Sequence, residues 1–172
     1  MISVMMKHRR FSMSALSAAF IGVLATAATA GDDGSLKARL EGFQEVPAVS
    51  TTGNGRFRGM ISKDETSIDY ELSYADLEGA TVLFAHIHLG QRTANGGVMA
   101  FLCGGGGKPA CPASPGSVSG TIIAADIIGP AGQGVDSGEL AAVVDALRSK
   151  VAYVNVQTSL FPSGEIRGQV KD

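Results

Sequence analysis

Apolar and polar residues alternate with a period of two along most of this chain. The clearest run covers residues 68–74, where Ile, Tyr, Leu and Tyr occupy every second position and polar residues lie between them. Because successive side chains on a strand point to opposite faces, this alternation predicts a strand with one buried and one solvent-facing side. Similar patterns predict strands at 36–40, ending at Gly42, and at 57–61, after a turn at 53–55. Further strands are expected at residues 82–89, 97–102, 116–123, 151–158 and 164–170.

A single stretch departs from this period. Apolar residues recur at positions i, i+3, i+4 and i+7 between Leu140 and Leu147, which predicts an amphipathic helix. Asp136 is the expected N-cap of this helix, with Glu139 as its capping-box partner. Short strands bounded by Gly, Pro, Asn and Ser are typical of sandwiches and barrels. The fold is therefore predicted to be all-β: an antiparallel, Greek-key-like β-sandwich with one short helix before the last two strands.

The N-terminal segment has the composition of a secretory signal peptide. Basic residues at 7–10 precede an apolar run at 11–25, and small residues at 28–30 fit a cleavage site. The run is too short for a membrane anchor, which needs about 20 strongly apolar residues. We expect a signal peptide at residues 1–30 and a single domain at 31–172, without a membrane span, in the periplasm or outside the cell. The paired arginines leave both the general and the twin-arginine export route open.

Charge limits the partners that this domain is expected to bind. The full chain has 14 basic and 16 acidic residues, and loss of residues 1–30 leaves 11 basic against 16 acidic, a formal charge of −5. Binding to phosphate groups needs a basic patch, and no cluster of basic residues is visible along the mature sequence. We therefore expect neither a nucleic acid nor an anionic membrane as a partner.

The two cysteines, Cys103 and Cys111, enclose a glycine-rich segment at 104–110. In an oxidising compartment the favoured interpretation is a disulfide bond, which would stabilise this loop by roughly 2–3 kcal/mol. A thiolate pair that binds a metal is the alternative. It is disfavoured because seven intervening residues do not match the short spacings of zinc sites.

His86 and His88 are the only histidines of the mature chain, and they lie two positions apart in a predicted strand. Residues i and i+2 of a strand share a face, so both imidazoles are within reach of one copper or zinc ion. A tight site needs further donors. The alternative is that both histidines pack and form hydrogen bonds with no metal. Candidate additional donors are Asp76, Glu78, Asn155, Gln157 and Glu165.

Four segments, taken in order, resemble the CHRD module, the repeat named after chordin. They are residues 40–47 (LEGFQEVP), 85–90 (AHIHLG), 152–158 (AYVNVQT) and 164–169 (GEIRGQ). The resemblance covers residues 35–171, nearly the whole mature chain. It implies an extracellular all-β domain that occurs singly in bacterial exported proteins and as repeats in chordin, a protein that binds secreted growth factors.

Two features of these segments concern the chemistry of the domain. The family pattern commonly has Asn-Val-His-Thr at the end of the strand at 152–158, whereas this chain has Gln157 at the histidine position. The third imidazole is then missing, and Gln is a poor ligand for transition metals. Glu165 and Arg167 are predicted on one face of the last strand, in surface ion pairs worth at most about 1 kcal/mol. Arg167 is also within reach of Glu45.

Catalytic arrangements are weakly supported by this sequence. No nucleophile elbow surrounds Ser73 or Ser159, the serines that could accompany His86 and Asp76. A small domain with one helix also offers little wall for a cleft with paired carboxylates. We therefore expect a secreted, non-enzymatic CHRD-type interaction or structural module without a cofactor, whose partner is an extracellular protein or glycan. The alternative is an extracytoplasmic copper- or zinc-binding protein that uses the pair of histidines.

Overall fold

The computed structural model describes residues 33–172, so the signal peptide predicted at residues 1–30 lies outside the described residues. All strand pairs in the described part of the chain are antiparallel. The strands are β1 (Ser35–Glu41), β2 (Asn54–Ile61), β3 (Ser67–Ala75), β4 (Val82–Leu89), β5 (Val98–Cys103), β6 (Gly116–Ile123), β7 (Ala152–Thr158) and β8 (Ile166–Gln169), with the helix α1 (Leu140–Arg148) before β7.

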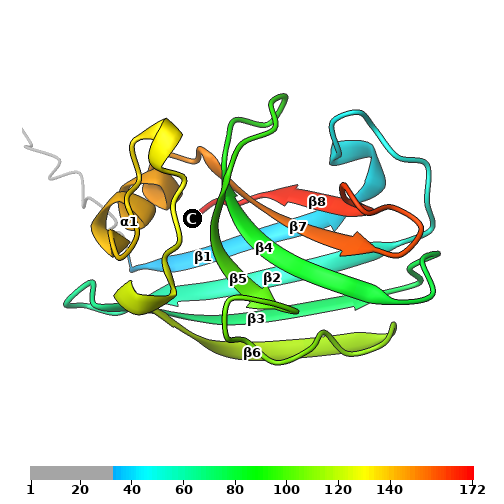
Figure 1. Cartoon of the computed structure of the whole chain (residues 1–172), viewed down its shortest axis with the longest axis horizontal. Coiled ribbons are helices and arrows are strands. Elements are labelled where there is room, and N and C mark those ends of the chain that lie inside the picture. Colours follow the sequence, from blue (N-terminus) through cyan, green and yellow to red (C-terminus); the bar gives the residue numbers. More distant parts are fainter. Residues whose placement is uncertain (1–32) are drawn as a thin grey trace, which may run out of the picture. The chain divides into compact units, whose positions relative to one another are not determined.

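The strands form one eight-stranded sheet in the order β5-β4-β7-β8-β1-β2-β3-β6. Figure 1 shows this sheet folded over itself, with β5, β4, β7 and β8 in one layer and β1, β2, β3 and β6 in the other. The inward-pointing residues of the strands supply the core, including the fully buried Leu40, Phe57, Leu72 and Ile87. The predicted fold class, antiparallel β with one short helix before the last two strands, is confirmed.

Helix α1 covers one end of the core with its apolar stripe. Val143, Val144 and Leu147 are at most 1% exposed. The predicted cap is wrong in detail, because the N-cap residue is Glu139 and not Asp136. The Glu139 carboxylate nevertheless accepts a hydrogen bond of 2.9 Å from the Asp136 backbone N–H, which is half of the expected capping box. Between residues 33 and 172, no helix combines the length and the apolar character needed to cross a membrane.

Most strand bounds agree with the alternation of the sequence, and two predictions need correction. The predicted strands at 82–89 and 116–123 match β4 and β6 residue for residue. The segment 53–55 is not a turn, because β2 already begins at Asn54, which pairs with Glu41 on one side and Ala75 on the other. The last strand is shorter than the predicted 164–170, since β8 begins only at Ile166.

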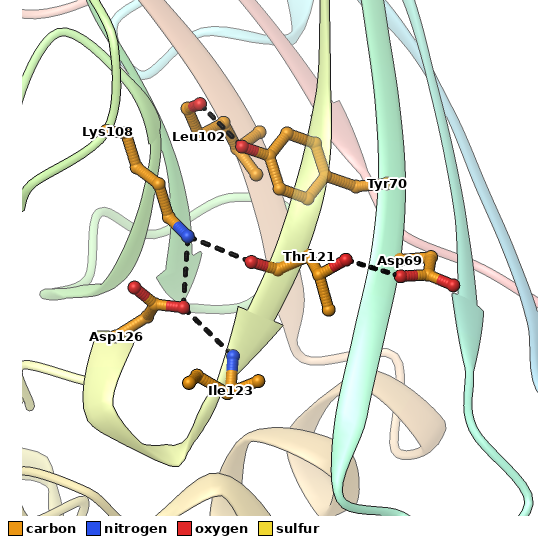
Figure 2. Close-up of polar contacts among 7 residues, drawn as sticks. All are labelled: Asp69, Tyr70, Leu102, Lys108, Thr121, Ile123 and Asp126. Atoms are coloured by element: carbon orange, nitrogen blue, oxygen red, sulfur yellow. Dashed lines mark hydrogen bonds and ion pairs between the residues drawn. The ribbon is translucent and has the colours of Figure 1, made fainter.

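The edge strand β5 is joined to β3 and to the other edge strand, β6, by a side chain and by the disulfide loop. Tyr70 on β3 donates a 2.7 Å hydrogen bond to the Leu102 carbonyl on β5 (Figure 2). Lys108, in the loop closed by the Cys103–Cys111 disulfide, donates to the Thr121 carbonyl on β6 and forms a 2.9 Å ion pair with Asp126. These contacts cover sheet edges that would otherwise be open to strand pairing.

Candidate functional site

The signature segments that are distant in sequence become neighbours in the sheet. His86 on β4 is the register partner of Asn155 on β7, and Asn155 is the register partner of Arg167 on β8. These side chains point away from the core and are nevertheless buried. We call this set the polar face; its members are His86, His88, Tyr153, Asn155, Arg167 and Gln169.

Arg167 is the centre of the polar face and is 1% exposed. Its guanidinium donates to the Gln91 and Ala94 carbonyls at 2.8 and 2.9 Å and to Asn95 Oδ1 at 3.1 Å. Its Cζ lies 3.5 Å from the centre of the Tyr153 ring, a cation–π contact. Arg167 therefore fastens the loop at 90–97 over the sheet.

A second loop, residues 42–53, is held over the polar face by Glu45. The Asn155 amide donates a 2.7 Å hydrogen bond to Glu45 Oε1. Burial raises the pKa of Glu45 to about 7, although the Arg167 charge and the Asn155 hydrogen bond act in the opposite direction. Gly164, at φ +139°, leaves the space for this pair, since a Cβ there would overlap Asn155 Nδ2 and Glu45 Oε1. The Arg167 charge thus acts on Glu45, as expected from their predicted proximity, while the hydrogen bonds of the two side chains go to different partners.

Glu165 and Arg167 are 0% and 1% exposed, so the prediction that they form cross-strand ion pairs on the surface is wrong. Its carboxylate accepts hydrogen bonds from the Thr51 and Thr158 hydroxyls at 2.8 and 2.7 Å. It also accepts from the backbone N–H groups of Glu78 and Gly79 at 2.6 and 3.1 Å. Burial opposes ionisation, but these four donors together hold the pKa of Glu165 below its usual value. Glu165 therefore joins the loop that carries Thr51 and the loop that carries Glu78 and Gly79 to the end of β7, through hydrogen bonds and not through an opposite charge.

The two histidines share one face, as predicted, with ring centres 5.3 Å apart. His88 stacks on Tyr153 at 4.7 Å, and its Nδ1–H donates to the Gly96 carbonyl at 3.0 Å. His86 packs edge-on against Phe101 at 4.4 Å. Two ring nitrogens, His86 Nδ1 and His88 Nε2, are buried without a hydrogen-bond partner among the described residues.

Both imidazoles are held in the neutral form. Burial lowers the pKa of His86 to about 4, and the neighbouring His88 adds to the effect. Burial also lowers the pKa of His88, against the Gly96 carbonyl and together with the Arg167 charge. Neutral imidazole is the form that binds metals.

Of the five additional donors named from the sequence, one lies directly beside the histidines. Asn155 is opposite His86, and its Oδ1 is buried without a partner in the part of the chain that is described. Gln157 is opposite Phe84, two pairs further along the strands. The carboxylate of Glu165 is saturated by its four donors. Asp76 and Glu78 are occupied with Asn54 and Thr52. Across residues 33–172, no group of three or more His, Cys, Asp and Glu side chains is placed to hold a metal ion.

Sequence analysis missed two groups of residues. Tyr153 and Gln169 complete the polar face. Their spacing of two residues from Asn155 on β7 and from Arg167 on β8 would have indicated that they share this face. The second group contradicts the absence of a basic patch: six exposed cations gather beside the polar face around an open groove of about 470 Å³. We call this the basic groove, and its cations are Lys37, Arg39, Arg56, Arg58, Arg92 and Lys171.

Comparison with known proteins gives one positive result. A search of curated proteins finds no match to this chain, and a search of solved structures finds none either. The family model of the CHRD domain matches residues 36–170, a range that runs from β1 through β8 and includes the whole polar face. The chain therefore belongs to the CHRD domain family.

Proposed function

We propose that this protein is an exported, non-enzymatic binding module. In this proposal the polar face is an internal framework that fixes the loops at 42–53 and 90–97. Binding of an extracellular protein or glycan takes place on the exposed surface of the domain.

One observation carries the proposal: the charged side chains of the family signature are buried and form hydrogen bonds within the domain. Glu45, Glu165 and Arg167 are 7%, 0% and 1% exposed, and their partners are strand and loop groups of the same domain. A catalytic acid or nucleophile has to reach a substrate, whereas these groups are covered by the loops that they hold. Their arrangement suits a rigid scaffold.

Two further features support export. The disulfide between Cys103 and Cys111 is of the kind that persists in oxidising compartments. The composition of residues 1–30 is that of a secretory signal peptide.

The test is to express the full chain and to characterise the exported form. We expect its mass to begin after residue 30. We also expect retention on at least one immobilised extracellular glycan or matrix protein, without turnover of ester or glycoside substrates. The variant Asn155→Ser should lower stability and leave the affinity of the folded fraction unchanged. Turnover that disappears in His86→Phe, while the domain stays folded, would contradict the proposal.

A metal-binding function is the second candidate, and the orientation of His88 favours it. Because Nδ1–H of His88 donates to the Gly96 carbonyl, the lone pair of Nε2 is free. Metal-ligating histidines commonly donate their second nitrogen to a carbonyl in this way. His86 Nδ1 and Asn155 Oδ1 are also buried without a partner within residues 33–172. The donor set of two imidazoles and an amide oxygen suits copper or zinc only weakly.

Elemental analysis and titration with copper and zinc test this second candidate. Stoichiometric binding at micromolar affinity or better, lost in the double variant His86→Ala/His88→Ala, would support it. The control is circular dichroism, which should show that the double variant remains folded. Absence of binding to the wild-type protein would assign the histidines to packing alone.

A further inference from the structure

The basic groove is formed by like charges placed directly opposite one another. On the outer side of the sheet, Lys37 of β1 is the register partner of Arg58 of β2, and Arg39 is the partner of Arg56. Like charges at directly opposed positions of a sheet are destabilising. A bridge between Lys37 and Lys171 adds another cation at the same edge. The fold therefore places positive charges close together here, although their mutual repulsion lowers its stability.

The charges of the groove are poorly neutralised. All six cations are exposed, and in the described part of the chain Arg39 is the only one in an ion pair, with Glu41 at 2.6 Å. The mature chain as a whole is acidic, yet the groove holds six of its 11 basic residues. A second hollow on the same face, of about 650 Å³, shares Arg39, Arg56 and Arg58 with the groove. Two acidic residues lie beside these cations, Glu41 next to Arg39 and Glu71 opposite Arg58. The strip keeps an excess of positive charge, which attracts an anionic ligand longer than a single ion.

One uncharged residue of the groove gives the ligand a second chemical property. Gln169 is 8% exposed, and its amide nitrogen donates to the carbonyls of Gly90 and Lys150 at 3.0 and 2.9 Å. These two acceptors determine the orientation of the amide. Its Oε1 is then a buried acceptor without a partner among residues 33–172, at the wall of the groove. A buried acceptor calls for a donor such as a hydroxyl group.

An exposed aromatic ring lies next to the cations. Phe43 is 74% exposed and lines a neighbouring hollow of about 350 Å³ together with Gln44 and Arg92, which also line the groove. A planar apolar ring beside cations and amides suits a sugar, whose ring has an apolar face and a rim of hydroxyl groups. The nearly isolated ring and the acidic charge of the domain are less suited to a nucleic acid, whose binding sites usually combine several stacking aromatics with a basic domain.

From these observations we propose that the basic groove binds an anionic polysaccharide. The acidic groups of successive sugars pair with the arginines, whose planar guanidinium groups match carboxylate and sulfate groups. A sugar hydroxyl donates to Gln169 Oε1, and Phe43 contacts a sugar ring at the end of the groove. The Cα atoms of the opposed cations are spaced by about 5 Å across the strands and about 7 Å along them, which is comparable with the spacing of acidic groups on neighbouring sugars. This inference rests on the proposed binding function and names its ligand class.

The test measures binding of the exported protein to polygalacturonate, dextran sulfate, neutral dextran and a single-stranded oligonucleotide, at low and high salt. We expect binding to the two acidic polysaccharides that weakens with salt, and none to neutral dextran. The variant Arg56→Gln/Arg58→Gln should bind at least 10-fold more weakly. It should unfold at the same or a higher urea concentration, because repulsion is removed. The matched control, Lys63→Gln/Arg148→Gln, removes two cations outside the groove and should change affinity less than twofold.

Several results would overturn this inference. Equal weakening in the variant and the control would show only an effect of net charge. Tighter binding to the oligonucleotide than to either polysaccharide would assign the groove to nucleic acid. If neither acidic polysaccharide binds, the inference is also refuted. If the protein is retained by another extracellular ligand and the variant is retained equally, the groove inference fails and the binding function stands. Enzymatic turnover would instead contradict the proposal that the protein is a non-enzymatic binding module.

Discussion

The guanidinium of Arg167 lies 3.5 Å from the centre of the Tyr153 ring, and the same ring stacks with His88 at a centroid distance of 4.7 Å. The contacts join three neighbouring strands, β8, β7 and β4, on the side of the sheet that faces away from the core. Gly96 is bonded to both rings, since its N–H donates to the Tyr153 hydroxyl and its carbonyl accepts from His88. The stack and the loop above it therefore form one unit.

Arg167→Lys should destabilise the domain by about 2–4 kcal/mol, because an ammonium group cannot replace the three hydrogen bonds and the stacked plane of the guanidinium. Urea unfolding followed by circular dichroism measures this change; the chain has no tryptophan for fluorescence. The matched control is Arg58→Lys on the exposed face, which should alter the free energy of unfolding by less than about 0.5 kcal/mol. Equal stability of the two variants would contradict the role assigned to Arg167.

Glu165→Gln should also cost about 2–4 kcal/mol, although it changes a single atom. Each carboxylate oxygen accepts from one hydroxyl and one backbone N–H, so an amide NH₂ at either position faces a backbone donor that cannot turn away. The same unfolding measurement applies, with Glu71→Gln on the exposed side of β3 as the control. A loss below about 0.5 kcal/mol would show that the four hydrogen bonds are not retained in solution.

The strands were predictable because their alternation reflects a physical constraint: one face of β1, β2 and β3 is in the core and the other is in water. Glu165 and Arg167 were assigned to the surface by the same rule, and there it failed. On β7 and β8 the second face is covered by the loops at 42–53 and 90–97. The alternation of residues within a strand does not predict where such a loop will lie. As a consequence every residue of these two strands is buried except Gln157, which is half-buried.

The basic groove could not be predicted for a related reason. Its cations are distributed along the chain from Lys37 to Lys171 and form no cluster in the sequence. They meet because of the pairing of β1 with β2, the bridge between Lys37 and Lys171, and the position of the loop that carries Arg92. The two histidines, by contrast, were correctly placed on one face, because a spacing of two residues is a local property of a strand.

Glu45→Gln should remove a pH dependence of stability between about pH 4.5 and 7. Burial raises the pKa of Glu45 to about 7 in the folded protein, so its contribution to stability is complete below the unfolded pKa and is lost as the pH rises through 7. Between pH 5 and 8 the wild type should lose about 2 kcal/mol more than the variant. Unfolding in urea at both pH values measures the difference. A parallel response of the two proteins would show that Glu45 titrates normally.

His86→Phe should make the domain more resistant to acid. The pKa of His86 falls to about 4 on folding, so its contribution to stability is present above the unfolded pKa of about 6.5 and is lost as the pH falls towards 4. At pH 5 the wild type should be destabilised by about 2 kcal/mol relative to pH 7.5, and the variant by clearly less. Titration of the His86 ring by NMR provides a direct control. A midpoint near 6.5 would contradict the burial of this ring.

Lys108→Met should destabilise the contact between the two sheet edges by about 1–2 kcal/mol. The ion pair is largely buried, with side-chain exposures of 14% for Lys108 and 20% for Asp126, so removal of the cation leaves a carboxylate without its charge partner. Burial opposes ionisation of Asp126, but the Ile123 N–H and Lys108 hold its pKa below the usual value. The double variant Lys108→Met/Asp126→Asn keeps an acceptor for the Ile123 N–H and removes the charge. It should therefore recover part of the lost stability, and additive losses in the two single variants would show that the pair does not couple the edges.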